Sequence, residues 1–149
     1  MDTKRNTSEA FKEAAALRAK NVIDAWKPDV VIASDDNASK YLIAPYLKGT
    51  DLPVVFCGVD WDASEYGFPA ENVTGMVEVS LIPQLLQTLK PYAKGGRVGY
   101  LSHDNLTNRK SVSHFKKAFQ LDVFPRFVDT FEEWKTGYLD LQNDMDMII

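Results

Sequence analysis

Residues 29–37 read Asp-Val-Val-Ile-Ala-Ser-Asp-Asp-Asn, and this stretch decides the fold. Its first part, up to Ser34, is short, apolar and β-branched, which is typical of a buried strand. The side chains of Asp35, Asp36 and Asn37 then offer N-caps for a helix. The stretch therefore predicts a buried strand that runs directly into a helix.

The alternation of helix and strand continues on both sides of this stretch. Ahead of it, apolar residues recur at helical spacing between Phe11 and Trp26, which indicates an amphipathic helix. After it, the second helix is expected to reach Gly49, and Pro45 should end or kink it because proline has no N–H to donate. Further strands are predicted at residues 53–58, 73–80, 97–102, 124–130 and 145–149, with helices at 81–93, 108–119 and 131–143. This order implies an α/β fold of mainly parallel sheets with helices on both faces.

Size, charge and cysteine content narrow the classes of protein. The chain has 149 residues, of which 45% are hydrophobic, enough for a core of ordinary domain size in one domain or two small lobes. Its net charge of −4 comes from interspersed acidic and basic residues, which argues against nucleic acid or anionic lipid as a partner. Cys57 is the single cysteine, so an internal disulfide and a cysteine-based metal cage are excluded. No apolar run approaches the roughly 20 residues that span a bilayer, and the first residues are too polar for a signal peptide.

Three predicted strand exits carry the candidate ligand-binding residues. Parallel strands present their carboxyl ends to one edge of a sheet, and open α/β sheets bind ligands at that edge. We therefore expect the three loops to lie together. The candidates are Asp35, Asp36, Asn37, Ala38, Ser39, Gly58, Val59, Asp60, Trp61, Asn105 and Thr107.

Each exit also has a purely structural interpretation. Helix N–H groups after the first strand could bind a carboxylate, and Asp35 or Asp36 could hold an ammonium group, but these residues could equally just cap the helix. Gly58 would permit close approach of a ligand and Trp61 offers a flat apolar wall, although a lone tryptophan usually packs in the core. The loop around Asn105 could hydrogen-bond a ligand or form a plain turn.

The sequence gives little support for a catalytic site or a metal site. Cys57 ends an apolar strand without a cationic neighbour in sequence, so we expect a buried, structural thiol. His103 and His114 are the only histidines, and no serine stands in a nucleophile elbow. The carboxylates between residues 132 and 146 lack the glycine and terminal glutamate of a calcium loop. The sequence predicts no catalytic, metal or cofactor site.

The motifs taken together resemble a known family. The motifs are Lys-Pro-Asp-Val-Val-Ile-Ala-Ser-Asp-Asp-Asn-Ala at residues 27–38, Pro-Val-Val-Phe-Cys-Gly-Val-Asp-Trp at 53–61, Asn-Val-Thr-Gly-Met at 72–76 and Phe-Glu-Glu-Trp-Lys at 131–135. This combination is similar to ABC-transporter substrate-binding proteins related to the tryptophan-type binding proteins, with the periplasmic-binding-protein type I fold. One departure is Asp60, which stands where the family motif has asparagine.

The resemblance implies a fold, a function and a location. Such proteins have two α/β lobes that close on a small ligand at the strand carboxyl ends, so residues 1–94 would be part of the first lobe and 95–149 part of the second. The chain would be a middle slice of that fold, with exposed edges that could self-associate. Its function would be to deliver a small organic ligand, such as an amino acid or related carboxylate, to an ABC transporter permease. The location would be periplasmic or otherwise extracytoplasmic, with the signal segment outside this sequence.

Two other classes of function stay open at this point. The same fold serves as the ligand-sensing input domain of signal-transduction receptors, which only the sequence outside this chain would distinguish from transport. A doubly wound α/β enzyme would need Cys57, His103 or the acidic pair to do chemistry. We expect no enzyme, because the sequence lacks a nucleophile, a base and an orienting group at recognisable spacing.

Overall fold

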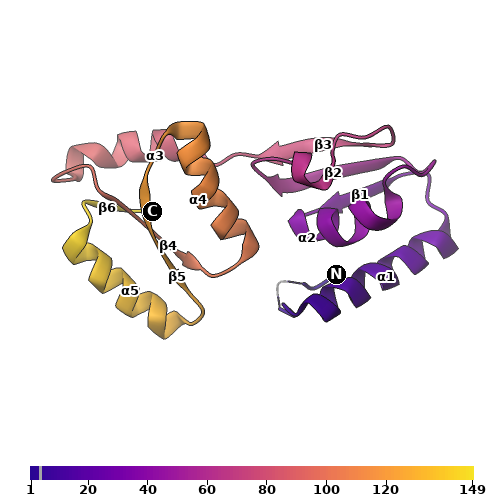
Figure 1. Cartoon of the computed structure of the whole chain (residues 1–149), viewed down its shortest axis with the longest axis horizontal. Helices are drawn as coiled ribbons and strands as arrows, with labels where there is room; N and C mark the ends of the chain where they lie inside the picture. The colour runs from indigo at the N-terminus through magenta and orange to yellow at the C-terminus, as the bar shows by residue number, and fades with distance from the viewer. Residues whose placement is uncertain (4) are drawn as a thin grey trace. The chain divides into compact units, whose positions relative to one another are not determined.

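Two separate three-stranded parallel sheets organise the chain (Figure 1). The computed structural model describes residues 1–3 and 5–149. These residues form two compact units, Met1–Val79 and Ser80–Ile149. The predicted α/β class with mainly parallel sheets is confirmed. The first unit ends at Val79, whereas the sequence analysis expects the boundary between the lobes at residue 94. The assignment of residues 80–94 to a lobe stays a prediction.

The first unit places helices and strands close to where the sequence predicts them. Its first helix has Ser8 as N-cap, whose hydroxyl accepts a hydrogen bond from the backbone N–H of Phe11, and it ends at Lys27 in the left-handed conformation. The order of elements is α1 (Glu9–Trp26), β1 (Val31–Ser34), α2 (Asp36–Ala38), η1 (Ser39–Leu47), β2 (Val54–Asp60), η2 (Ser64–Tyr66) and β3 (Val73–Glu78).

The helix that contains Pro45 differs from the prediction. It continues past Pro45 to Leu47, and from Ser39 onward it has π-helical geometry. At its end, Lys48 donates its backbone N–H to the carbonyl of Ile43, five residues back, at 2.9 Å. Proline removes one N–H from a helix, and the wider π turn is one way in which a helix departs from α geometry without ending.

The strands of this unit pair directly and in parallel. Ser34 at the end of β1 lies opposite Cys57 of β2, and Val54 at the start of β2 lies opposite Val73 of β3. The register between β2 and β3 shifts between Phe56 and Val59, which marks an irregularity in β2. All three strands therefore end at the same edge of the sheet.

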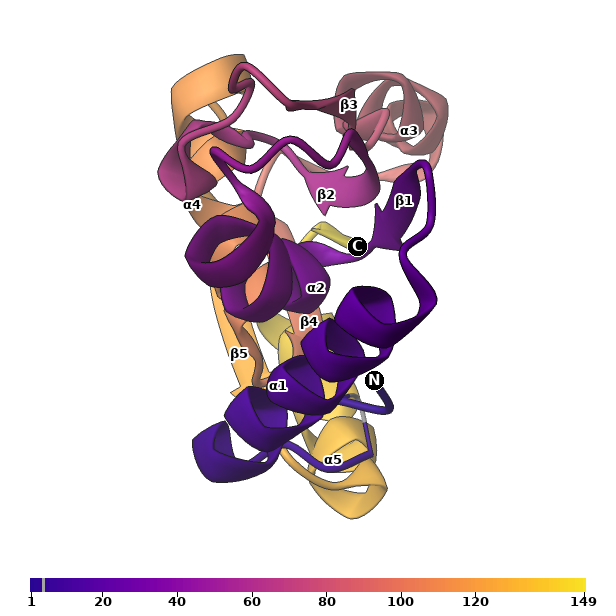
Figure 2. The same cartoon turned by 90° about the vertical axis from the view of Figure 1, so that its right-hand side faces the viewer.

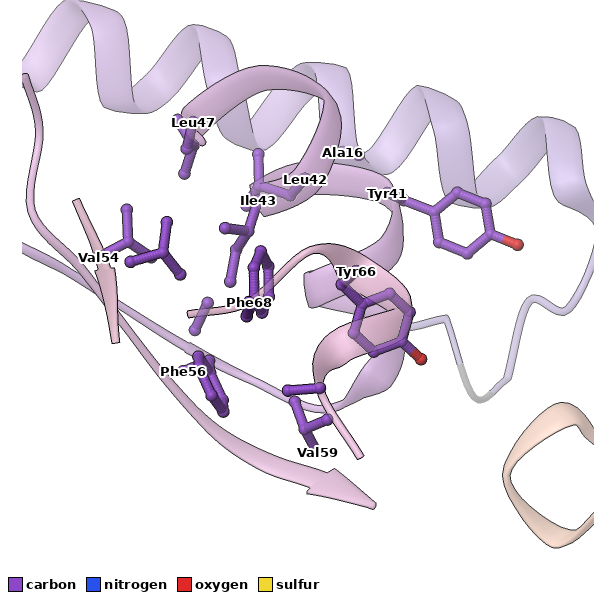
Figure 3. Packing of buried hydrophobic residues seen from close by; sticks show 13 residues of the cluster. Ala16, Tyr41, Leu42, Ile43, Leu47, Val54, Phe56, Val59, Tyr66 and Phe68 are labelled. Atoms are coloured by element: carbon purple, nitrogen blue, oxygen red, sulfur yellow. The ribbon is translucent and has the colours of Figure 1, made fainter. Parts of the chain in front are cut away.

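One face of this sheet carries the core of the unit. Side chains of η1, including Ile43 and Leu47, lie over Val54 and Phe56 of β2, and α1 and α2 lie on the same side of the sheet (Figures 2 and 3). The Phe56 ring stacks on Phe68 with centroids 5.3 Å apart. Fully burying an apolar side chain of this size contributes about 1.5–3 kcal/mol, so this cluster supplies much of the stability of the unit.

The second face of the same sheet is open, whereas the predicted arrangement with helices on both faces is found in the second unit. Ile32 and Met76 lie there and are 73% and 72% exposed. Cys57 shares this face, because it alternates with the buried Phe56 along β2, and it is half-buried rather than buried as predicted. An open apolar face is compatible with the self-association expected from the sequence, which stays a prediction.

The second unit has helices on both faces of its sheet. Its strand order is β5-β4-β6, all parallel. On β4, Tyr100 contacts Phe115 of α4, whereas the neighbouring Leu101 lies against Gly137 of α5, and adjacent strand residues point to opposite faces. The elements are α3 (Ile82–Leu89), η3 (Lys90–Tyr92), β4 (Val98–His103), α4 (Leu106–Phe119), β5 (Val123–Val128), α5 (Phe131–Asp144) and β6 (Met147–Ile148).

We predict that Gly75→Ala strongly destabilises the first unit. A Cβ atom on Gly75 would lie 2.0 Å from the carbonyl oxygen of Phe56, and this oxygen belongs to the backbone and cannot rotate away. The expected loss in the free energy of unfolding is about 2–3 kcal/mol, the upper part of the usual range for overpacking. Urea unfolding followed by circular dichroism measures it. Gly96→Ala is the control, because a Cβ there has nothing within 4 Å, and equal losses for both variants would contradict the prediction.

Candidate functional site

The exits of β1 and β2 lie side by side. The last paired residues are Ser34 and Cys57, and directly after them the backbone N–H of Asp35 donates to the carbonyl of Cys57 at 3.0 Å. Residues 35–39 therefore follow β1, while residues 58–60 are the last residues of the neighbouring β2 and Trp61 follows it, all at one edge of the sheet. This is the arrangement in which open α/β sheets bind ligands.

Asp36 ties these two exits together from inside the protein. Its side chain is buried, with 2% of the residue exposed. One carboxylate oxygen accepts a hydrogen bond from the hydroxyl of Tyr66 at 2.6 Å, and the other accepts one from the backbone N–H of Asp60 at 3.2 Å. Burial, and then the bond to the Asp36 carboxylate, raise the pKa of Tyr66 well above its ordinary value. Asp36 thus links the start of α2 to the end of β2.

Asp35 has a backbone conformation that is rare for a residue with a side chain. Its φ is 87° and its ψ is 151°. Its carboxylate accepts a weak hydrogen bond from the backbone N–H of Asn37 at 3.3 Å, as an N-cap does, and the residue is only partly buried. Strained residues of this kind cost about 1–3 kcal/mol and cluster at ligand sites. Trp61, at the exit of β2, also has a positive φ, of 65°.

Several of the predicted site residues point into the interior. Val59 and Trp61 are buried among the hydrophobic residues of the unit, which agrees with the structural interpretation of Trp61 as core. Ser39 is fully buried, and its hydroxyl has no hydrogen-bond partner among the residues that the structure describes. Gly58 has a φ of 61°, and a Cβ there would lie 3.0 Å from the hydroxyl of Ser34. Glycine at this position therefore lets the two exits approach each other closely.

A cavity of about 300 Å³ opens at the exit of β1. Three predicted site residues line it, namely Asp35, Asn37 and Ala38. Sequence reasoning missed the other described residues of its lining, Ser34 and residues 1–3, because nothing in the sequence connects the first residues with β1. A volume of this size is at the lower end of small-molecule sites.

Asn105 and Thr107 lie in the second unit, at the carboxyl end of β4. The side-chain oxygen of Asn105 accepts the backbone N–H of Asn108 at 2.8 Å and so caps α4. The next residue along the chain from β4, Asp104, forms a two-point ion pair with Arg109, with both N–O distances 2.6 Å, and this hydrogen bonding lowers the pKa of Asp104. A ligand-binding role for Asn105 and Thr107 stays a prediction.

The described part of the chain offers neither a metal cluster nor a helix that could span a membrane. Residues 1–3 and 5–149 contain no group of three or more histidine, cysteine, aspartate or glutamate residues placed to hold a metal ion. Within the same residues, every helix is too short or too polar to cross a membrane.

Comparison with known proteins shows a likeness in fold. No family model matches the chain, and no curated protein matches it. The solved ligand-free, open structure of CD0873, a substrate binding protein with adhesive properties from Clostridium difficile, matches with a TM-score of 0.58 at 16% sequence identity. The match covers 91% of this chain and 48% of CD0873, so the chain spans about half the length of that protein. The chain therefore has the fold of about half of a substrate binding protein.

We expect Asp35→Gly to be more stable than Asp35→Ala by about 1–3 kcal/mol. Both substitutions remove the cap on Asn37, but only glycine adopts a φ of 87° with a ψ of 151° without strain. The free energies of unfolding of the two variants, measured side by side in urea, give the difference. An alanine variant as stable as the glycine variant would show that Asp35 is not strained in solution.

The bond between Tyr66 and Asp36 should be worth about 1.5–3 kcal/mol, because the acceptor is a buried carboxylate. Tyr66→Phe is expected to lose this amount in urea unfolding, whereas Tyr92→Phe, at a highly exposed tyrosine, should stay within about 0.5 kcal/mol of the parent. In a double-mutant cycle with Asp36→Ala, the two changes should not add, since either one removes the contact between the hydroxyl and the carboxylate. Additive losses would mean that the hydroxyl and the carboxylate act independently.

Proposed function

We propose that this chain is the ligand-binding part of a solute-binding protein that serves an ABC transporter. The observation that carries the proposal is the cavity of about 300 Å³ where β1 ends beside β2. It lies at the edge of a parallel sheet, where α/β proteins bind ligands. The likeness in fold to a substrate binding protein supports it. The proposed partner is a transporter permease, and the proposed location is extracytoplasmic.

The proposed ligand is a small organic molecule with an ammonium group, such as an amino acid. Asp35 is the candidate partner of the ammonium group, because its carboxylate lines the cavity and is only partly buried. Asp36, the other candidate in the sequence, is 2% exposed and is not among the described residues that line the cavity. The modest volume of the cavity favours a ligand of amino-acid size.

The proposed role is binding without catalysis. The lining of the cavity comprises hydroxyl, carboxylate, amide and aliphatic groups, and neither Cys57 nor a histidine is among its described members. Asp104 and Arg109 pair with each other in the second unit, as a structural ion pair does. The carboxylates of Asp2 and Asp35 line the cavity, and the proposal assigns them to binding a ligand.

Thermal unfolding in the presence of single L-amino acids tests the proposal. At an amino-acid concentration of 100 times Kd, binding should stabilise the chain by about 2.7 kcal/mol and raise its Tm accordingly. The N-acetylated form of the same amino acid lacks the ammonium group and should give no shift. Asp35→Asn, which keeps the geometry of the cap but not the charge, should abolish the shift as well.

Three results would count against this function. The first is that no L-amino acid shifts the Tm at millimolar concentration. The second is that an N-acetyl amino acid shifts the Tm as much as the free amino acid. The third is that the Asp35→Asn variant keeps the full shift. The first result would remove amino acids as ligands. The other two would remove the ammonium contact at Asp35.

A further inference from the structure

Thr3 has a burial that its polarity does not explain, whereas Met1 and Asp2 beside it are exposed. Thr3 is 8% exposed although it belongs to a polar segment ahead of α1. Residues 1–3 line the cavity at the exit of β1, together with Ser34, Asp35, Asn37 and Ala38. A short polar segment becomes buried only where specific contacts hold it.

One contact comes from Asn37. Its side-chain amide donates a hydrogen bond to the hydroxyl oxygen of Thr3 at 3.2 Å. The backbone N–H of the same residue donates to the carboxylate of Asp35 at 3.3 Å. Asn37 therefore fixes two sides of the cavity at once, the Asp35 side through its backbone and the Thr3 side through its side chain.

A second set of contacts folds the segment back at Asp2. The backbone N–H of Asn6 donates to the carbonyl of Asp2 at 3.3 Å, and the side-chain amide of Asn6 donates to the carboxylate of Asp2 at 3.2 Å. Asp2 has a φ of 54°, which belongs to a tight turn.

We propose that residues 1–3 form a wall of the ligand cavity at the exit of β1, and that the bond from Asn37 to Thr3 holds this wall in place. That the cavity holds a ligand rests on the proposed function, but the wall itself can be tested without a ligand. Thr3 is a positioning residue. Its loss should leave the cavity in place while opening it to solvent, and should weaken the binding of whatever the cavity holds.

A thiol placed inside the cavity reports whether the wall is present. In a Cys57→Ser background, Ala38→Cys introduces a single thiol at a residue that lines the cavity. Its rate of reaction with N-ethylmaleimide is measured by mass spectrometry. Adding Thr3→Val, which has the same shape without the hydroxyl, should raise the rate roughly three- to tenfold, the equilibrium change expected for one lost hydrogen bond. Thr7→Val, at an exposed threonine outside the cavity, is the matched control and should change nothing.

Two labelling results would overturn the proposal that residues 1–3 form a wall. The first is an equal labelling rate for Thr3→Val and Thr7→Val. The second is that the thiol of Ala38→Cys, without either of these changes, already reacts as fast as a free thiol. Because Ala38→Cys could disturb α2, Ser34→Cys in the same background serves as a second reporter at another residue of the lining, outside α2. Circular dichroism establishes that each reporter protein is folded.

The ligand part of the proposal has its own outcome. The amino acid that stabilises the parent chain should bind the Thr3→Val variant with an apparent affinity at least threefold lower, as measured from the Tm shift. An unchanged affinity would overturn the role of the wall in binding. If no amino acid stabilises the parent, the proposed function fails, and the labelling rates still decide whether residues 1–3 cover the cavity. The two failures are therefore distinguishable.

Discussion

The buried carboxylate of Asp36 is the constraint on which the carboxyl edge of the first sheet depends. A carboxylate taken out of water is tolerated only if donors surround its oxygens, and here Tyr66 and the backbone of Asp60 supply them. These donors come from η2 and from the end of β2, and Asp36 itself begins α2. Satisfying one charge therefore fixes three segments relative to each other. Asp35 and Asn37 flank this residue, so the shape of the cavity follows from the same requirement.

The order of strands and helices could be predicted from the sequence because it depends on local patterns. The apolar run before Ser34, followed at once by capping residues, is enough to specify β1 and the helix start after it. The π geometry around Pro45 and the open face with Ile32 and Met76 could not be predicted in this way. Both depend on which neighbours surround a segment, and apolar spacing along the chain does not contain that information.

The candidate site was predictable in place but not residue by residue. Parallel strands end at one edge, so residues 35–39 and 58–61 could be placed there from topology alone. Whether a given side chain at that edge faces a cavity or the core depends on backbone angles, such as the positive φ of Asp35 and Trp61. The partners Tyr66 and Thr3 were missed because they lie 30 and 34 residues from the residues they contact, a separation at which sequence carries no spacing signal.

The conformation of Asp35 has a consequence for how the sequence can drift. Aspartate and glycine codons differ by a single base, so a change that relieves the strained backbone is always close at hand for this position. Stabilising changes are easy to find in natural proteins, and a glycine at this position would be one of them. The carboxylate of Asp35 is therefore present at this sheet edge at a cost in stability that a glycine would not carry.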